Sequence, residues 1–178
     1  MDGEPGLVVV DGWGPVADEL TAQLRRVGLE VGGGVHAADG AELGVAVGTP
    51  AAVVVVAQGR APGWAGAPWQ ARGVPHLPLV LGRRRLVVGP LVLPGRTPCL
   101  RCTAPAWDTS RVLEVAEVGA EALVLATAVA VVTVLAAVRG DESLGGISTE
   151  VALHEVRVTH RVWSPRPGCR CTGETMAG

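Results

Sequence analysis

Short apolar runs alternate with an amphipathic stretch in the first third of the chain. Leu7–Val10 and Ala51–Ala57 carry no charge and are rich in β-branched residues, a pattern typical of strands that are buried on both faces of a sheet. Between them, residues 16–27 carry apolar side chains at helical spacing, with most of the charged side chains on other faces. Leu29–Val31 then predicts a second strand, so the chain opens with a strand, a helix and a strand, as in α/β folds.

The rest of the chain carries further strand patterns and one long helical pattern. Pro75–Leu81 and Leu86–Leu93 predict two strands joined by a hairpin, and residues 147–163 alternate like one or two more strands. Glu114–Arg139 is the longest helical pattern of the chain. Weaker patterns predict two shorter helices, over residues 37–48 and 64–72.

Ala122–Val138 carries no charge and is the one segment that raises the question of a membrane span. Its length is at the short limit for crossing a bilayer, and it consists mostly of Ala and Val. We therefore expect a helix that is buried in the fold or at an interface, and no membrane partner. Because this helix is apolar nearly all round, one face is expected to contact the sheet and another to contact a second subunit of a homodimer.

Length and composition narrow the range of functions. We expect a single domain over residues 1–171, followed by a disordered tail over residues 172–178. The formal net charge of −2 gives no electrostatic reason to expect nucleic acid as a partner. All 15 basic residues are arginines, which excludes lysine Schiff-base chemistry and a P-loop lysine. The N-terminus lacks the basic and apolar segments of a secretory signal, which predicts a cytoplasmic protein.

Four cysteines form two close pairs, C-x-x-C and C-x-C: Cys99 with Cys102, and Cys169 with Cys171. Thiolates at these spacings in tight turns can occupy two corners of a tetrahedron, and two such pairs complete a closed site for structural zinc. Arg101 and Arg170 lie between the pairs' members and would offset the charge of four thiolates. Local disulfides, free thiols and a redox C-x-x-C motif are the alternatives. We predict zinc, because the second pair uses all the remaining cysteines.

The loop after the first predicted strand has the outline of a nucleotide-binding glycine motif. Gly12 and Gly14 occupy the first two glycine positions of G-x-G-x-x-G/A. However, Trp13 would crowd a phosphate there, and Pro15 removes a backbone N–H donor at the start of the helix. The third predicted strand runs into Gln58 rather than into a carboxylate that would hold magnesium. We therefore expect a degenerate loop with a packing role and no bound cofactor, with a working nucleotide site as the alternative.

The other residues capable of chemistry are scattered. The four histidines, at positions 36, 76, 154 and 160, show no metal-ligand spacing among themselves. His76 lies between Pro75 and Pro78, and we expect it to be a hydrogen-bonded histidine at the end of a strand. No catalytic residue is predicted.

Several blocks of the sequence resemble a known family. Leu7–Val31 is similar to the opening of a ThiF-like (E1-like) domain. Gly73–Leu81 with Val88–Cys102, and the ending Arg161–Cys171, resemble the E1-like proteins of thiazole/oxazole-modified peptide biosynthesis, one class of ribosomally synthesised and modified peptides (RiPPs). The resemblance covers most of the chain, and the two cysteine-bearing blocks are its specific part.

The resemblance implies a Rossmann-like, doubly wound ThiF/E1-like domain with a four-cysteine zinc site toward its C-terminus, in a dimer or complex. In that family the E1-like domain accompanies a YcaO-type cyclodehydratase, which uses ATP to convert Cys, Ser or Thr of a precursor peptide into azolines. Active E1 enzymes adenylate a carboxylate with an Arg and a Lys near the ATP phosphates and an Asp on the metal. Many family members begin with a winged-helix domain that binds the leader peptide. This chain starts at the first strand, and we expect it to be truncated and to lack that domain.

We therefore predict a non-catalytic E1-like scaffold or docking subunit. It would act with a YcaO-type cyclodehydratase or another RiPP-modifying enzyme, and with the precursor peptide. Structural zinc is the expected cofactor, and ATP is not expected. An ATP-dependent adenylating E1-like enzyme with a divergent nucleotide site is the alternative, and a free-standing dinucleotide-binding module is a third hypothesis.

Overall fold

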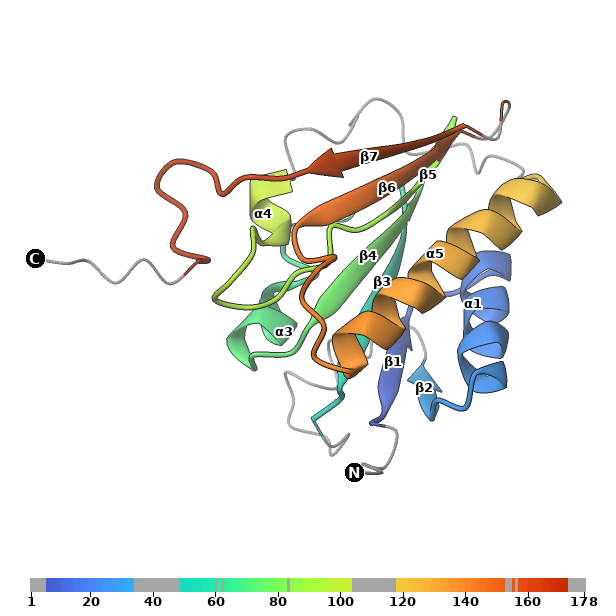
Figure 1. The fold of residues 1–178 in the computed structure, drawn as a ribbon, viewed down its shortest axis with the longest axis horizontal. Helices are drawn as coiled ribbons and strands as arrows, with labels where there is room; N and C mark the ends of the chain where they lie inside the picture. The colour runs from blue at the N-terminus through green and yellow to red at the C-terminus, as the bar shows by residue number, and fades with distance from the viewer. Residues whose placement is uncertain are drawn as a thin grey trace, which may run out of the picture.

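A single mixed sheet of seven strands forms the centre of the molecule, in the order β2-β1-β3-β4-β5-β6-β7 (Figure 1). The computed structural model describes residues 6–33, 49–59, 61, 63–82, 84–103, 118–152, 155 and 157–172. The strands are β1 (Val8–Asp11), β2 (Val31–Gly33), β3 (Ala52–Gln58), β4 (His76–Leu81), β5 (Arg85–Val88), β6 (Ile147–Ala152) and β7 (Val158–Val162). The helices are α1 (Pro15–Arg26), α3 (Ala67–Ala71), α4 (Leu100–Thr103) and α5 (Ala120–Val138).

The sheet changes character halfway across. β1 pairs in parallel with β2 and β3, and β3 pairs in parallel with β4, whereas β5, β6 and β7 continue the sheet in antiparallel pairs. The predicted α/β class is confirmed as a mixed α/β fold, and residues 147–163 form two strands. The helix predicted over residues 37–48 lies outside the described residues, and so does residue 173 onward of the predicted tail.

One predicted strand is shorter than its apolar pattern. The pattern runs from Leu86 to Leu93, but β5 ends at Val88. Gly89 then adopts a φ of +96°, and Pro90 has no backbone N–H to offer a neighbouring strand. Leu91 and the residue after it form only isolated bridges, although their side chains stay buried. Burial therefore continues past the point where the strand geometry stops.

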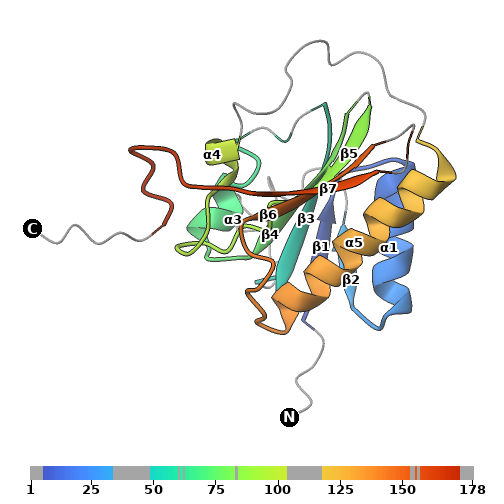
Figure 2. The ribbon, with the colours of Figure 1, turned by 45° about the horizontal axis from the view of Figure 1, so that its top comes forward.

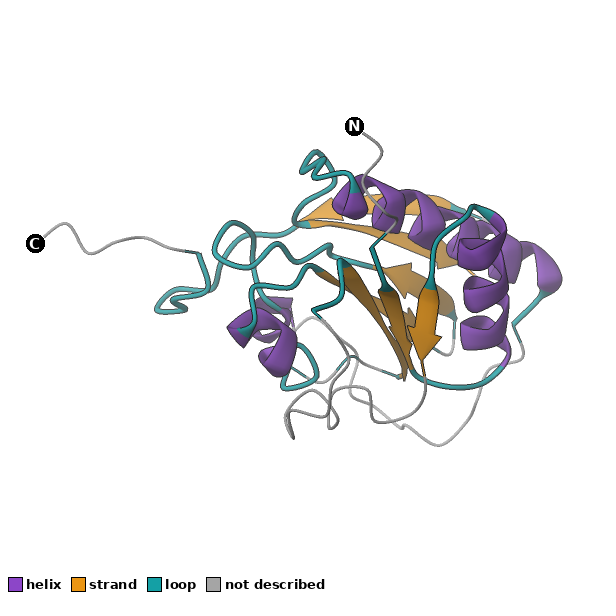
Figure 3. Ribbon diagram, turned by 90° about the horizontal axis from the view of Figure 1, so that it is seen from below, coloured by secondary structure: helices purple, strands orange, loops and turns teal. Residues whose placement is uncertain are grey.

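Alternate residues of the central strands point to opposite faces, and both faces are covered. In β3, Val54 belongs to a core with α1 and α5, while Val53 and Val55 belong to a second core with Trp69 of α3. In β5, Leu86 faces the α1 and α5 side, whereas Val87 packs against Leu100 of α4 on the other side. Figure 3 shows the two helix groups separated by the sheet. The period of two in these runs therefore requires helices on both sides.

The apolar helix α5 lies across one face of the sheet, beside α1 (Figure 2). It is the one helix among the described residues that is long and apolar enough to cross a membrane, with a mean hydropathy of 2.4. Its Ala126, Ala130 and Val134 are buried against the sheet. By contrast, Val124 and Val132 are 56% and 60% exposed. Packing on the sheet accounts for the apolar character of one face of α5, and the outer face remains apolar and uncovered in the described structure.

Candidate metal centre

The first cysteine pair is held by α4 and the turn that precedes it. Cys102 lies within α4, and its backbone N–H donates to the carbonyl oxygen of Cys99 at 2.9 Å. Leu100 between them is 1% exposed and packs with Val80 and Val87 of the sheet. Because the sheet fixes Leu100, the two thiols on either side of it are directed away from the core, toward the C-terminal segment.

The second pair comes from the segment that follows β7, which we call the C-terminal arm (residues 163–172). Figure 1 shows this arm leaving β7 and passing α4 before the chain ends. A turn forms where the N–H of Cys169 donates to the carbonyl oxygen of Arg166 at 2.9 Å, with Gly168 at a φ of +78°. Thr172 then forms an isolated parallel bridge with Gly95. The bridge holds the end of the arm beside the turn that leads into α4.

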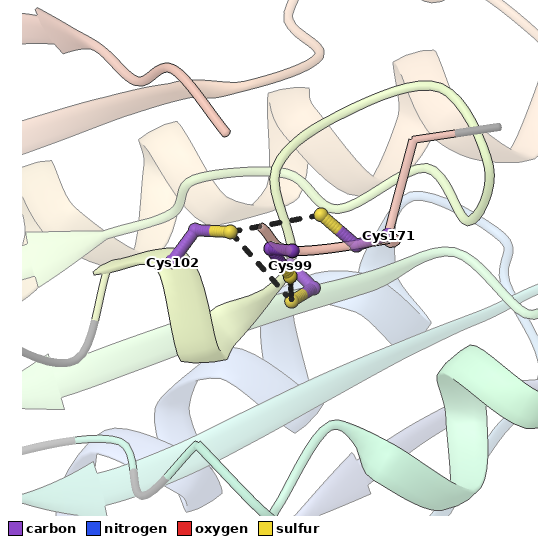
Figure 4. A group of neighbouring side chains, drawn as sticks. Cys99, Cys102 and Cys171 are labelled. Carbon is purple, nitrogen blue, oxygen red and sulfur yellow. Dashed lines mark hydrogen bonds between the residues drawn. The ribbon is translucent and has the colours of Figure 1, made fainter. Parts of the chain in front are cut away.

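The four sulfur atoms converge on one point. The Sγ of Cys99 lies 3.9 Å from that of Cys102 and 3.8 Å from that of Cys169, and the Sγ atoms of Cys102 and Cys171 are 3.6 Å apart. All four lie within 4.8 Å of one another. Figure 4 shows the labelled side chains pointing toward a common centre, with dashed lines for the hydrogen bonds. All four cysteines are free, so disulfides do not account for this arrangement.

The spacing of the sulfur atoms fits a tetrahedral metal ion. A zinc–sulfur bond of about 2.3 Å requires an edge of about 3.8 Å between the sulfur atoms of a regular tetrahedron. The three Sγ–Sγ distances given above differ from that edge by no more than about 0.2 Å, and the other pairs lie within 4.8 Å. Cys99, Cys102 and Cys171 are buried, and Cys169 is half-buried. Four thiolates around one ion fill its coordination sphere, so the group could hold a metal ion without leaving a position for substrate.

Without a cation, this cluster is electrostatically unfavourable for thiolates. Burial raises the pKa of Cys171 to about 12, and it raises the pKa of Cys102 as well. Partial burial also acts to raise the pKa of Cys169, but hydrogen bonds from Cys171 and the other cysteines outweigh it and lower this pKa to about 7. The pKa of Cys169 is therefore lowered, while the pKa values of Cys102 and Cys171 are raised. A bound metal ion removes this conflict, because it stabilises all four thiolates together.

Two backbone contacts of the cluster could not be predicted from the spacing of the cysteines. The N–H of Arg166 donates to the Sγ of Cys102 at 3.3 Å, and the bridge of Thr172 with Gly95 lies next to Cys171. Of the two arginines expected to offset the thiolate charge, Arg101 has its pKa raised by a hydrogen bond to Cys99 and by the charge of the neighbouring thiols. The cysteine spacing predicted which thiols meet, but not which N–H groups donate to them.

The glycine loop is a place of close backbone approach. A Cβ on Gly12 would lie 2.8 Å from the carbonyl oxygen of Val56, and the φ of Gly12 is +150°. At Gly14 the φ is +93°, and a Cβ there would meet no atom within 4 Å. A shallow cleft of about 330 Å³ opens beside the loop, with Trp13, Asp18 and Arg25 among its lining residues. Tight packing against β3 thus gives Gly12 a structural reason to be glycine.

The two described histidines lie on different strands. His76 begins β4 and is 1% exposed. Its Nδ1 lies 3.0 Å from the carbonyl oxygen of Val74, and since a carbonyl can only accept, Nδ1 carries the proton. His160 lies on β7, with its Nδ1 3.0 Å from the hydroxyl of Thr149. The two other histidines lie outside the described residues.

No protein-family model matches this chain, and no curated protein sequence does. Several solved structures share its fold. A heterocyclase in complex with substrate and cofactor matches 95% of the chain with a TM-score of 0.72 and 17% identity, and the heterocyclase TruD matches 95% with a TM-score of 0.67 and 17% identity. MccB from E. coli, solved with MccA, matches 96% with a TM-score of 0.69 and 14% identity. MccB has also been solved with ATP.

The chain spans only part of these proteins. It corresponds to 26% of the first heterocyclase chain, 27% of TruD and 67% of MccB. At these sequence identities, the comparisons show a shared fold.

The burial of His76 predicts a pH dependence of stability. Burial lowers the pKa of His76 to about 4, against an ordinary value of 6.5, despite the opposing hydrogen bond to Val74. The unfolded chain therefore takes up a proton near pH 6.5, whereas the folded chain does so only near pH 4. Stability that is present above pH 6.5 is lost as the pH falls toward 4, by on the order of 3 kcal/mol.

Urea unfolding at several pH values measures this effect. His76→Gln cannot titrate, so its free energy of unfolding should fall less than that of the wild type between about pH 7 and about pH 4. The comparison of the two slopes cancels the contributions of the other acidic and basic groups. Parallel slopes would show that His76 does not titrate differently in the folded chain.

Proposed function

We propose that this chain is a Rossmann-like, ThiF/E1-like docking subunit of a RiPP-modifying system. In this proposal it acts with a YcaO-type cyclodehydratase, or with another RiPP-modifying enzyme, during azoline or thiazole formation on a precursor peptide. It holds structural zinc on Cys99, Cys102, Cys169 and Cys171, and it has no catalytic activity of its own. The cytoplasm suits such a subunit, because thiols stay reduced there and remain available to a metal.

The fold shared with two heterocyclases over 95% of the chain is the observation that carries this proposal. Both of these proteins are named as heterocyclases, and MccB, which shares the fold, was solved with MccA. The sequence blocks around the cysteines independently resemble the E1-like proteins of thiazole/oxazole biosynthesis. The parallel order β2-β1-β3-β4, with helices on both faces, supports a Rossmann-like description.

Zinc is the metal that the donor set favours. The site offers four sulfur donors, and three of the four side chains are buried. Closed sites of four thiolates are typical of structural zinc, whereas magnesium and calcium prefer oxygen ligands. When bound, the ion would supply a cross-link between α4 and the C-terminal arm rather than a reaction centre. The residues of this chain would do the rest: Arg166 donates its N–H to Cys102, and Arg101 offsets part of the thiolate charge.

We infer the absence of independent catalysis from the glycine loop and its surroundings. Adenylation needs cations and donors around the phosphates and an anchored magnesium ion. The chain has no lysine, Pro15 offers no N–H at the start of α1, and β3 ends at Gln58. The close approach of Gly12 to Val56 gives this loop a packing role that needs no ligand.

A second candidate function is adenylation by a divergent E1-like enzyme. Two observations favour it: MccB, which shares the fold, was solved with ATP, and a cleft of about 330 Å³ lies beside Gly12 and Gly14 here. In this alternative, Asp11 at the end of β1 is the carboxylate that would hold the metal ion.

We also propose that the subunit forms a homodimer through the outer face of α5. Val124, Ala128 and Val132 follow one another at intervals of one helical turn and are all exposed. An apolar stripe of this kind on an otherwise mixed surface is typical of an interface.

The zinc proposal predicts about one zinc ion per chain in purified protein, because the site is closed by four thiolates. Cys169→Ser should abolish stoichiometric zinc and lower the melting temperature, since metal binding at a structural site contributes on the order of several kcal/mol to folding. Ser164→Ala, an exposed change in the same arm, is the control and should leave both unchanged. Metal analysis and thermal melting measure the two effects. A metal-free protein that melts at the same temperature as Cys169→Ser would refute the site.

The docking proposal predicts that the isolated chain does not exchange pyrophosphate into ATP with any peptide carboxylate. Azoline formation should rise with added chain only when a YcaO-type cyclodehydratase and its precursor peptide are present. Isotope exchange and mass spectrometry of the peptide measure the two outcomes. Exchange above background that disappears in Asp11→Ala would instead favour the adenylating enzyme.

The dimer proposal predicts opposite effects from two neighbouring changes in α5. Val132→Arg places a charge on the exposed stripe and should yield a folded monomer. Val134 is 1% exposed, so Val134→Arg would bury an unpaired charge and should unfold the chain. Size-exclusion chromatography with light scattering, together with circular dichroism, distinguishes these outcomes. A wild-type chain that is monomeric at all concentrations contradicts the interface.

A further inference from the structure

The strand β7 forms one edge of the sheet and is uncovered. All five of its residues are exposed, and among them Val158 and Val162 are 39% and 76% exposed. β7 pairs with β6 on one side, and within the described part of the chain no segment pairs with its other side. Open edge strands are usually protected by charged side chains, lysine above all, by proline or by a bulge, because their free N–H and C=O groups attract another strand. β7 contains no proline and no lysine, and Arg161 is its one arginine.

The hydrogen bonds that flank β7 show which backbone groups face the open edge. Ala152 donates to the carbonyl oxygen of Arg157 at 2.9 Å, and Trp163 donates to that of Gly146 at 3.0 Å. In an antiparallel pair, residues alternate between facing the partner strand and facing away from it. Residues 159 and 161 therefore also face β6. The backbone groups of residues 158, 160 and 162 point outward, where they form a row of donors and acceptors for an added strand.

The two faces of β7 differ in chemistry. Val158 and Val162 lie opposite Val151 and Ile147 in the register, so they share the face on which α5 packs. His160 lies between them on the same face, opposite Thr149, and its Nδ1 is 3.0 Å from the Thr149 hydroxyl. Thr159 and Arg161 share the other face. That face includes a hollow of about 480 Å³, lined by three arginines and two glutamates: Arg84, Arg85, Arg157, Glu150 and Glu155, with Thr159 and Ala152. A strand added at this edge would meet one mainly apolar row, beside Val158 and Val162, and one polar row.

The edge is also strongly basic for a chain of net charge −2. From residue 156 to residue 173 the sequence contains four arginines and one histidine, and no acidic residue. Glu155 precedes this stretch and lies 3.8 Å from Arg157 in an exposed ion pair. The guanidinium of Arg161 stacks over the ring of Trp163, 4.0 Å from its centroid. A second copy of the chain at this edge would bring one basic strip against an identical one, which is unfavourable. An acidic partner would be attracted.

We infer that the open edge of β7 binds an extended acidic peptide segment by strand addition. The segment alternates apolar residues, which follow the face of Val158 and Val162, with Glu or Asp, which follow the face of Arg157 and Arg161. Main-chain hydrogen bonds to residues 158, 160 and 162 supply the affinity, and the alternation supplies the specificity. Binding at this edge goes beyond the docking function proposed above, and it requires neither a metal ion nor a particular modifying enzyme.

Synthetic peptides test this inference with the full chain. The probe is a fluorescein-labelled peptide of about eight residues in which Val and Glu alternate, a length matched to a short strand. The controls are a peptide of the same composition with all its Val residues before its Glu residues, and an alternating Val and Lys peptide. Fluorescence anisotropy should detect binding of the alternating acidic peptide alone. Equal binding of the block peptide would overturn strand addition, and equal binding of the Val and Lys peptide would overturn charge selection.

A matched pair of variants separates main-chain from side-chain recognition. His160→Pro removes one outward N–H without removing a bond to β6, whereas His160→Ala keeps the N–H and removes the same side chain. Affinity for the acidic peptide should fall about tenfold in His160→Pro relative to His160→Ala. Equal affinities of the two variants would overturn the proposal.

Amide hydrogen exchange of the wild-type chain gives a test that needs no variant. The amides of Val158 and Val162 should exchange rapidly in the free chain and slowly with the alternating acidic peptide, while those of Thr159 and Arg161 are protected in both states. Unchanged exchange at Val158 and Val162 in the presence of saturating peptide would overturn the inference. Protection of the same amides by a single-stranded oligonucleotide instead of the peptide would also overturn it, because the basic strip would then serve nucleic acid.

Discussion

Burial of the central strands on both faces is the constraint on which the other features of this molecule depend. Val53 and Val54 of β3 are adjacent in sequence, point to opposite faces and are both fully buried. Neither face can be left to water, so α1 and α5 cover one and α3 and α4 cover the other. The position of α4 follows from this requirement, since Leu100 fills the core beside Val87. The first pair of cysteines is therefore fixed by the packing of the sheet.

The cysteine cluster extends that order to a segment with little core of its own. The C-terminal arm leaves an exposed strand and is itself mostly exposed from Trp163 to Arg170. Such a segment buries too little apolar surface to offset the entropy of ordering it. Four converging sulfur atoms, the bridge of Thr172 with Gly95 and the N–H donated by Arg166 hold it beside α4 instead. A metal ion at the cluster would make this attachment part of the folding free energy.

Coverage decreases steadily from the parallel half of the sheet to β7. The strands β1, β3 and β4 are buried, β6 is partly buried, and β7 is exposed along its whole length. The cysteine cluster and the open edge both lie in the less covered half, and the C-terminal arm connects them. The two features differ in what they offer a partner: the four sulfur atoms of the cluster face one another, whereas the edge presents backbone groups that pair with no described segment. A docking role rests more naturally on the second.

The sequence by itself determined the parts of this protein that depend on local pattern. Uncharged β-branched runs predicted the strands β1 and β3, helical spacing predicted α1 and α5, and the close spacing within each cysteine pair predicted that its thiols share a turn. Local pattern also explains the limits of these predictions. The run from Leu86 to Leu93 is apolar throughout, but the chain leaves strand geometry at Gly89 because backbone conformation, rather than hydrophobicity, ends β5.

Only the tertiary structure decided how distant groups are brought together. The cysteine pattern predicted one four-cysteine site, but 66 residues lie between the two pairs, and their convergence depends on the packing of α4 and on the path of the arm after β7. The same is true of α5, where the sequence is apolar all round and the sheet alone determines that Val134 is buried and Val132 is not. The exposed edge of β7 had no distinct signal, since its alternation resembles that of β6. The difference between the two strands is the presence of a neighbour, and neighbours are set by long-range packing rather than by the residues of the strand itself.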